Sequence, residues 1–233
     1  MLNFLGIGAQ KSGTTWLYKT LAKHPKIMFP GEKEVHFWDS PQNRSVEWYL
    51  NLFLDESHIN GDITPAYGIL TKDVIQNIYE LLPHLRLIYL IRNPIERAWS
   101  SARMALERAE MTHLEGSDQW FIDHFMSKGS LARGDYETCI RQWRSVFPSS
   151  QLLVMRHETI RNSPVVAANK VLHHLGQESF FTESDCQTLG EKVFEGDGVP
   201  LRPTLLPVLQ DIYSKHIDSL SEYLQEDFSD WKK

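Results

Sequence analysis

Five apolar runs along the chain predict strands. The clearest covers Leu85–Ile91, where five apolar residues follow one another without a polar break, and similar short runs occur at Leu2–Ile7 and Gln151–Met155. Runs of this length are typical of parallel strands buried on both faces. Weaker strands are expected at Ile27–Phe29 and at Asn60–Thr64, the second running directly into a proline. The pattern therefore predicts a mainly parallel sheet.

Helical periodicity separates these runs. It predicts helices at Thr14–His24, Ser45–Leu54, Asp73–Leu82, Asp118–Lys128, Tyr136–Phe147, Pro164–Leu175 and Leu205–Leu224. In the third of these, Val74, Ile78 and Leu81 are expected to face inward, and the last is expected to be interrupted near Pro207. Strands that alternate with helices predict an α/β fold, here a single Rossmann-like domain over residues 1–233 with a central parallel sheet flanked by helices.

Composition narrows the classes of partner. The net charge of −6 and the absence of a Lys/Arg run before the terminal pair disfavour nucleic acid or a long sulfated polyanion, and favour a small or weakly charged ligand. No run of apolar residues is long enough for a membrane span, and no signal peptide precedes the first strand, so a cytoplasmic location is expected. Cys139 and Cys186 suggest neither a disulfide framework nor a zinc site. The oligomeric state cannot be read from the sequence.

The segment after the first strand has the form of an anion-binding loop. Gly8 and Gly13 frame a turn into a helix, where backbone N–H groups and the helix dipole favour a negatively charged ligand. The spacing is close to that of the nucleotide triphosphate loop G-x-x-x-x-G-K-[ST]. However, Thr14 stands where that motif has lysine, and the lysine lies within the loop, at Lys11. The loop is thus P-loop-like with a displaced cation, unless Lys11 is an ordinary solvated lysine.

A second candidate cation follows the clearest strand. Arg92 comes directly after Leu85–Ile91, and a helix start follows it. Asn93 is expected to be the N-cap, Pro94 to take the first helical position, and Glu96 to reach back as in a capping box. Ligands of open α/β sheets bind beyond the carboxyl ends of the strands, so Arg92 is a candidate ligand-binding residue. Its structural alternative is an ion pair with a nearby carboxylate.

Three sequence blocks resemble a known family. Lys11-Ser12-Gly13-Thr14-Thr15-Trp16 is similar to the 5′-phosphosulfate loop of sulfotransferases that use 3′-phosphoadenosine-5′-phosphosulfate (PAPS), and Leu90–Ser100 resembles their 3′-phosphate block. The block Lys33–Asp39 is similar to a segment of the heparan-sulfate sulfotransferase-like and related bacterial branch. With Trp143–Leu153 added, the resemblance covers the chain as far as Leu153 and is loose beyond it.

The resemblance implies a binding role for the matched residues. To the 5′ end of PAPS it assigns Lys11, Ser12, Gly13, Thr14 and Thr15, and to the 3′-phosphate Arg92 and Ser100. A lysine at the bridging oxygen of the departing phosphate would stabilise the transition state more than the ground state, which raises the rate. By resemblance to the cytosolic branch, Trp16 is placed to stack on adenine. The alternative for Trp16 is an ordinary core tryptophan.

Two residues compete for the role of general base, because an acceptor hydroxyl must lose its proton as it attacks. The resemblance to the heparan-sulfate branch makes Glu34 the base and His36 its assistant, whereas the cytosolic branch uses a histidine from elsewhere in the chain. The structural alternatives are an ion pair of Glu34 with Lys33 or Lys11, and a histidine satisfied beside its aromatic neighbours.

Two segments depart from the family pattern. In Gly61–Tyr67, Ile63 stands where the family often has a lysine, which puts the geometry at the acceptor in doubt. Asp62 is expected to be mainly structural, with the orientation of a nearby group as the alternative. The family usually closes a late, basic, glycine-bearing loop over the cofactor. Gly196–Arg202 is the candidate here, with Arg202 as its cation and a further candidate cofactor-binding residue.

These features predict a PAPS-dependent sulfotransferase with PAP as its product. The acceptor would be a hydroxyl, or as second choice an amine, of a small molecule, lipid or carbohydrate. No metal is expected, because the strand that carries the magnesium-binding aspartate of kinases ends here in Arg92. The alternatives are a P-loop kinase-like phosphotransferase, disfavoured by Thr14 and Arg92, and a catalytically inactive nucleotide-binding module, disfavoured by Glu34 and His36.

Overall fold

The computed structural model describes residues 1–31, 33–191 and 199–232. The chain divides into two compact units. The first unit comprises Met1–Ile91 with Gln142–Val193, and the second comprises Arg92–Arg141 with Phe194–Lys233. The first unit contains the sheet, and the described residues of the second contain helices and no strand. That residues 1–233 act as one domain stays a prediction.

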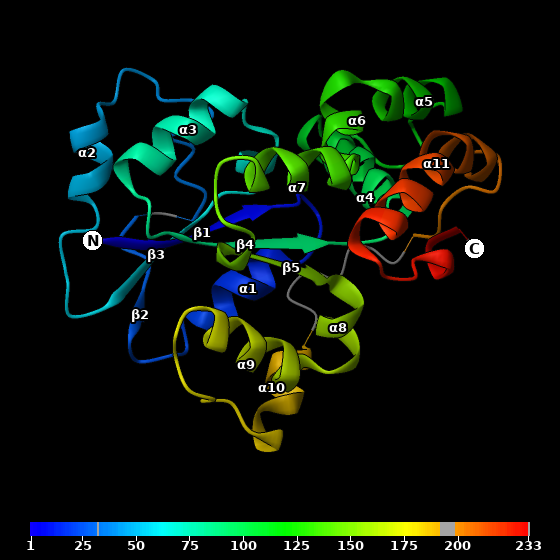
Figure 1. Cartoon of the computed structure of the whole chain (residues 1–233). Coiled ribbons are helices and arrows are strands. Elements are labelled where there is room, and N and C mark those ends of the chain that lie inside the picture. The colour runs from blue at the N-terminus through cyan, green and yellow to red at the C-terminus, as the bar shows by residue number, and fades with distance from the viewer. Residues whose placement is uncertain (32, 192–198, 233) are drawn as a thin grey trace. The chain divides into compact units, whose positions relative to one another are not determined.

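A five-stranded parallel sheet forms the centre of the first unit (Figure 1). Its strands lie in the order β2-β3-β1-β4-β5, with every neighbouring pair parallel. Their bounds are β1 Leu2–Gly8, β2 Ile27–Met28, β3 Ile59–Ile63, β4 Arg86–Ile91 and β5 Leu152–Arg156. All five predicted strands are therefore present, and the predicted α/β fold with a central parallel sheet is confirmed. Because β1 lies between β3 and β4, the loop that follows β1 leaves the sheet near its middle.

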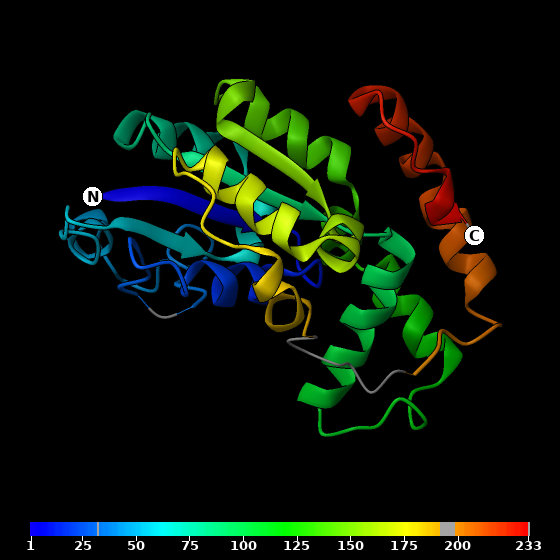
Figure 2. The ribbon, with the colours of Figure 1, turned by 90° about the horizontal axis from the view of Figure 1, so that it is seen from below.

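Helices cover both faces of this sheet. In the first unit they are α1 Thr14–Leu21, α2 Val46–Asn51, α3 Lys72–Leu81, α8 His157–Asn162, α9 Pro164–His174 and α10 Cys186–Gly190, with short 3-10 turns η1 Pro65–Ile69, η2 Ser149–Gln151 and η3 Glu183–Asp185. Helices α1, α9 and α10 lie on one face and α3 on the other (Figure 1). The view from below shows α9, in yellow, lying along the first of these faces (Figure 2).

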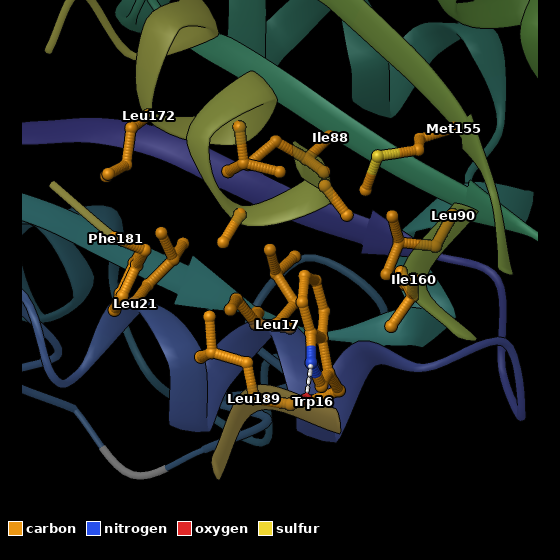
Figure 3. Close-up of a cluster of buried hydrophobic side chains, with 14 of the residues drawn as sticks. Trp16, Leu17, Leu21, Ile88, Leu90, Met155, Ile160, Leu172, Phe181 and Leu189 are labelled. Carbon is orange, nitrogen blue, oxygen red and sulfur yellow. Dashed lines mark hydrogen bonds between the residues drawn. The ribbon is translucent and has the colours of Figure 1, made fainter. Parts of the chain in front are cut away.

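A buried cluster of apolar side chains joins α1, α8, α9 and α10 to the sheet (Figure 3). Its labelled members are Trp16, Leu17, Leu21, Ile88, Leu90, Met155, Ile160, Leu172, Phe181 and Leu189. Full burial of each leucine or isoleucine side chain contributes about 1.5–3 kcal/mol. This packing fixes α1 against β1 and β4, and so fixes the loop between β1 and α1.

The inward face of α3 differs from the prediction. Ile75 and Ile78 are buried, together with Leu82 just after the helix, whereas Val74 is partly exposed and Leu81 is exposed. Both sets of residues fit the helical repeat. The observed set is spaced by three and then four residues, and the predicted set by four and then three. The orientation of the helix over the sheet, which periodicity does not contain, selects the first set.

The second unit is built around α4. Its helices are α4 Pro94–Arg108, α5 Asp118–Met126, α6 Lys128–Gly134 and α11 Leu206–Leu224, with η4 Ser229–Lys232, and α7 Tyr136–Arg144 crosses the boundary between the units. The buried Arg97 of α4 donates through Nη2 to the Ser130 carbonyl at 3.1 Å and to the Tyr213 hydroxyl at 3.2 Å. This guanidinium thus ties α4 to α6 and α11.

Helix α11 is continuous, so the predicted interruption near Pro207 is wrong. The proline occupies the first turn, where a missing N–H breaks no helical hydrogen bond and the fixed φ suits the helix.

Within the described residues, no helix is both long and apolar enough to cross a membrane. Cys139 and Cys186 are not joined by a disulfide.

Candidate active site

The loop between β1 and α1 is held against β4 by its backbone. The Ala9 N–H donates to the Leu90 carbonyl at 2.6 Å, and the Ser12 N–H donates to the Ala9 carbonyl at 3.2 Å. Lys11 and Gly13 adopt left-handed conformations, with φ of 66° and 99°. The two left-handed residues let the loop close on itself and turn the chain into α1.

The N-terminus of α1 offers unsatisfied donors. Gly13 is the N-cap and has no side chain to bind them, and the first turn carries no acidic residue. The Leu17 N–H donates to the Gly13 carbonyl at 3.0 Å, so the N–H groups of the three residues between them point out of the helix end. In addition, the Ser12 hydroxyl is buried and has no hydrogen-bond partner among the described residues. An uncapped helix end beside an unsatisfied buried hydroxyl fits an anionic ligand.

The segment after β2 brings both candidate bases together. His36 Nδ1 lies 2.8 Å from Asp39 Oδ2, and His36 Nε2 lies 3.6 Å from Glu34 Oε2. Lys33 forms an ion pair with the other oxygen of Glu34. The side chains of His36 and Glu34 are 41% and 36% exposed, which leaves both accessible to an acceptor. The chain Asp39–His36–Glu34 can therefore receive a proton from a bound hydroxyl.

This segment lies at the same edge of the sheet as the β1–α1 loop. The His36 N–H donates to the Thr64 hydroxyl at 3.5 Å. Thr64 directly follows β3, and its own N–H donates to the Gly6 carbonyl of β1 at 3.0 Å. Because the carboxyl ends of parallel strands meet at one edge, the loop of Lys11 and the segment of Glu34 both leave the sheet there. The first unit thus combines a candidate anion site and a candidate proton acceptor at one edge of the sheet.

Arg92 and Ser100 both belong to the second unit. Arg92 Nε and Nη2 donate to Glu96 Oε2 at 2.9 and 2.6 Å, which realises the ion-pair alternative in this structure. Asn93 is the N-cap as predicted, and its side chain accepts from the Ile95 N–H at 3.0 Å. Because Glu96 binds Arg92, the predicted capping box is wrong. Arg92 precedes the N-cap and lies outside α4, whereas Glu96 and Ser100 are four residues apart within α4 and share one of its sides, with Ser100 partly exposed.

Arg202 makes three hydrogen bonds within the second unit. Its guanidinium donates to Asp118 Oδ1 at 2.5 Å and to two backbone carbonyls of the segment before α5, at 2.5 and 2.8 Å. These contacts give Arg202 a structural role in holding the start of α5. Of the predicted cofactor loop Gly196–Arg202, residues 196–198 lie outside the described residues.

Two apolar residues of the predicted site belong to the core. Trp16 is 6% exposed, and its indole N–H donates to the Leu189 carbonyl at 2.8 Å (Figure 3). Ile63, which stands where the resembling family often has lysine, is buried in the same cluster. A Cβ placed on Gly6 would lie 2.8 Å from Ile63 Cγ1, so the two strands pack closely at this point. Position 63 therefore supplies no cation to the site.

Two residues beside the candidate site were not identified from the sequence. Asp39 contacts His36 and could have been found by its spacing of three residues within the same block. His157 directly follows β5, and a Cβ on Gly13 would lie 3.2 Å from its Cδ2 atom. The signal for His157 is the rule already applied to Arg92, namely a polar residue at the carboxyl end of a predicted strand.

The described part of the chain contains no group of three His, Cys, Asp or Glu side chains placed to hold a metal ion.

Curated relatives share sequence with most of the chain. It is 27% identical over 203 residues to bifunctional heparan sulfate N-deacetylase/N-sulfotransferase 4 of Mus musculus, covering 79% of this chain and 23% of that protein. Heparan sulfate glucosamine 3-O-sulfotransferase 3A1 of Mus musculus is 27% identical over 208 residues, covering 83% of this chain and 52% of the relative. The chain thus spans about a quarter of the length of the N-deacetylase/N-sulfotransferase that it matches.

Solved structures share the fold. A sulfotransferase from Alicyclobacillus acidocaldarius superposes with a TM-score of 0.79 at 23% identity, covering 100% of this chain and 99% of that one. Mouse sulfotransferase SULT7A1 complexed with PAP gives a TM-score of 0.64 at 14% identity, covering 96% of this chain and 88% of that one. These likenesses show the architecture, and the family itself is shown by a sequence model. The model of the sulfotransferase domain matches residues 3–188, and the chain, as its three motifs predicted, belongs to the sulfotransferase family.

Proposed function

We propose that this chain transfers the sulfuryl group of PAPS to a hydroxyl group of an acceptor. The observation that carries the proposal is the anion site after β1, where an uncapped helix N-terminus, a buried unpaired hydroxyl and Lys11 occur in one loop. Family membership supports the reaction class. PAPS supplies the activated sulfuryl group, and the chain's own residues bind it, orient it and remove the acceptor's proton.

The 5′ end of PAPS is proposed to bind at the β1–α1 loop. Lys11 supplies the positive charge, the hydroxyls of Ser12, Thr14 and Thr15 donate to the anionic oxygens, and the backbone N–H groups from Gly13 onward supply neutral donors. Each charge-assisted hydrogen bond of this kind contributes about 1.5–3 kcal/mol. Lys11 is also proposed to stabilise the negative charge that grows on the departing phosphate, an interaction that strengthens in the transition state.

The 3′-phosphate is proposed to bind Arg92 and Ser100. The support for this assignment is that Arg92 directly follows β4 and that Ser100 lies about two turns into α4, the helix that comes next in the chain. Arg92 must then share or exchange its present contact with Glu96. Adenine stacking on Trp16 stays a prediction, and it requires access to a ring now covered by the core and by the Leu189 carbonyl.

The predicted contact from Arg202 also stays a prediction. It would require the guanidinium to give up Asp118 and the two carbonyls that it now binds.

Proton removal is proposed to occur at Glu34 with His36 beside it. Asp39 lies at Nδ1 of His36, which orients the ring so that Nε2 faces Glu34. If Glu34 accepts the proton it becomes neutral, and His36 holds it in position through the 3.6 Å contact; if His36 accepts the proton, the Glu34 carboxylate stabilises the imidazolium through the same contact.

The acceptor is proposed to be a carbohydrate or another small molecule with a free hydroxyl, with an amine as second choice. Two relatives are named as heparan sulfate sulfotransferases, which supports a sugar acceptor. The net charge of −6 favours a small or weakly charged sugar over a long polyanion.

A metal-free reaction is proposed because a cation, Arg92, follows β4 where kinases carry a magnesium-binding aspartate. Lys11 and the helix N-terminus would supply the compensating positive charge. Addition of a chelator should leave turnover unchanged. Loss of turnover that Mg²⁺ restores would overturn this part of the proposal.

A thermal-shift experiment separates the sulfotransferase from a kinase. A ligand present at a hundred times its Kd stabilises the folded state by about 2.7 kcal/mol. PAP should therefore raise the melting temperature, whereas ATP with Mg²⁺ should not. Transfer of labelled sulfate from PAPS to a panel of sugars and alcohols then distinguishes an enzyme from an inactive nucleotide-binding module. A larger shift with ATP, or no transfer to any acceptor, would contradict the proposed function.

A further inference from the structure

Asp62 is a buried carboxylate at the end of β3, with hydrogen-bond donors on both of its oxygens. It is 2% exposed. The hydroxyls of Tyr49 and Tyr67 donate to Oδ2 at 2.8 and 2.9 Å, and the Thr64 hydroxyl donates to Oδ1 at 2.7 Å. Burial raises the pKa of Asp62, and these hydrogen bonds, with one from the Val35 backbone, oppose the rise. Four donors satisfy the lone pairs of this buried carboxylate, which makes it a fixed centre of hydrogen bonds.

Two of these hydroxyls also accept hydrogen bonds from the segment that carries the proposed base. The His36 N–H donates to the Thr64 hydroxyl at 3.5 Å, and the Phe37 N–H donates to the Tyr67 hydroxyl at 3.0 Å. The backbone of Val35 bonds to Asp62 itself. Consecutive N–H groups from 35 to 37 are therefore all connected to one carboxylate, either directly or through one hydroxyl.

The direction of these hydrogen bonds depends on the carboxylate. An ionised aspartate only accepts, so the hydroxyls of Thr64 and Tyr67 must donate to it and keep their own lone pairs for the backbone N–H groups. In Asp62→Asn an NH₂ group replaces one of the accepting oxygens, so a donor would face a hydroxyl that now donates to Asp62. The left-handed φ of Glu34 and of His36, 67° and 54°, lies in a region that few non-glycine residues adopt, so the segment needs such external support.

We propose that Asp62 is a positioning residue for the reaction, which orients the Glu34–His36 pair toward the acceptor by fixing the backbone of residues 35–37 through Thr64 and Tyr67. This inference rests on the proposed function and adds a residue that the sequence suggested was mainly structural. Ile63, the neighbour of Asp62 in β3, is buried and apolar, so at this point of the strand Asp62 makes the polar connection that keeps the segment in place.

The two tyrosines provide a matched pair of variants. Both donate to the same oxygen of Asp62 and both are buried, but only the Tyr67 hydroxyl also accepts from the Phe37 backbone. Tyr67→Phe removes the connection to the Phe37 backbone and leaves those of Val35 and His36, whereas Tyr49→Phe removes a donor to Asp62 while its ring still stacks on Phe37 at 4.6 Å between centroids. Thr64→Val and Thr64→Ser form a second pair, since only serine keeps the hydroxyl.

Steady-state kinetics on the full chain should separate positioning from folding. We expect Tyr67→Phe and Thr64→Val to lower kcat by up to about 10²-fold, the effect of a misplaced catalytic group. The KM for PAPS and the affinity for PAP should stay at the wild-type values. Tyr49→Phe and Thr64→Ser should keep the wild-type kcat. The proposal would be overturned if kcat fell equally in both members of a pair, or if the KM for PAPS rose while kcat stayed the same.

Amide hydrogen exchange tests the same inference without relying on turnover. Exchange of the N–H groups at residues 35–37 should accelerate in Tyr67→Phe and in Asp62→Asn, and should not change in Tyr49→Phe. If the wild-type chain transferred no sulfate, the proposed function would fail while this comparison still tested the positioning. Unchanged exchange in Tyr67→Phe would refute the positioning whatever the activity.

Discussion

The guanidinium of Arg92 is bound by Glu96, whose Oε2 atom accepts from Nε at 2.9 Å and from Nη2 at 2.6 Å. Both side chains are accessible, at 26% and 48% exposure. A 3′-phosphate that binds Arg92 brings negative charge to the same guanidinium. On the proposed assignment, Glu96 would be both an orienting partner of Arg92 and a competitor of the phosphate.

This relationship predicts opposite effects of two substitutions on the affinity for PAP. Arg92→Ala should weaken binding by about 1.5–3 kcal/mol, the value of a charge-assisted hydrogen bond. Glu96→Gln should strengthen it by up to about 1 kcal/mol, the range of an accessible ion pair. Isothermal titration calorimetry measures both. Arg141→Ala is the control, because Arg141 pairs with Glu137 at the same four-residue spacing. Unchanged affinity in Arg92→Ala would contradict the assignment.

Lys11 is expected to act mainly on the chemical step. Lys11→Ala should lower kcat by about 10²–10³-fold, the effect of removing one donor to developing charge. Single-turnover transfer of labelled sulfate measures it, with Lys19→Ala, an exposed lysine of α1, as the control. A fall in PAPS affinity with unchanged kcat would mean that Lys11 stabilises the ground state and the transition state equally, which would contradict its proposed role in the chemical step.

Replacement of each candidate base should identify the proton acceptor. If Glu34 is the base, Glu34→Gln should lower kcat by about 10²–10⁴-fold, and His36→Asn and Asp39→Asn should have smaller effects because those residues act through Glu34. The pH dependence of kcat measures which group must be deprotonated. Glu56→Gln, an exposed carboxylate in the loop before β3, is the control. A larger loss in His36→Asn would reverse the two roles.

The core position of Trp16 predicts a stability effect. Trp16→Ala should lower the free energy of unfolding by about 3–5 kcal/mol, as for other large buried aromatic residues. Urea denaturation followed by circular dichroism measures this change. Trp48→Ala, at a position 39% exposed, should cost much less. Equal losses in the two variants would contradict the burial of Trp16.

The burial of His174 leads us to expect that the stability of the fold depends on pH. Burial, followed by the charge of Arg86, lowers the pKa of His174 below its ordinary value of 6.5, although a hydrogen bond with the Leu87 backbone opposes the shift. Below pH 6.5 the unfolded chain therefore takes up a proton that the folded chain resists, so stability falls as the pH falls through that value. His174→Gln should reduce the loss measured by urea unfolding at pH 7.5 and 5.5. His173→Gln, on an exposed side of α9, is the control.

The sequence predicted the sheet and the turn between β1 and α1 because both depend on local signals. A buried parallel strand is an apolar run, and the turn after β1 requires glycine where the backbone is left-handed, as at Gly13. Asn93 and Pro94 likewise marked the start of α4 by the hydrogen bond and the φ that such a start requires. The family motifs lie on these same local features, which is why the family could be identified as well.

The inward face of α3 could not be read in this way. Two sets of residues fit the helical repeat equally well, and only the packing of the helix on the sheet distinguishes Ile75 and Ile78 from Leu81. The capping box failed for a related reason, since Glu96 had a cation within reach and bound Arg92 in preference to the backbone.

What the sequence by itself determined was the order of the elements, the fold class, and the residues that follow each strand. Only the tertiary structure decided which distant residues a side chain contacts. Trp16 bonds to Leu189, Arg202 bonds to Asp118, and Asp62 is connected through Thr64 to the segment of His36. The physical reason is range. Backbone conformation follows from neighbouring residues, whereas a buried polar group takes its partner from whichever distant segment the packing brings next to it.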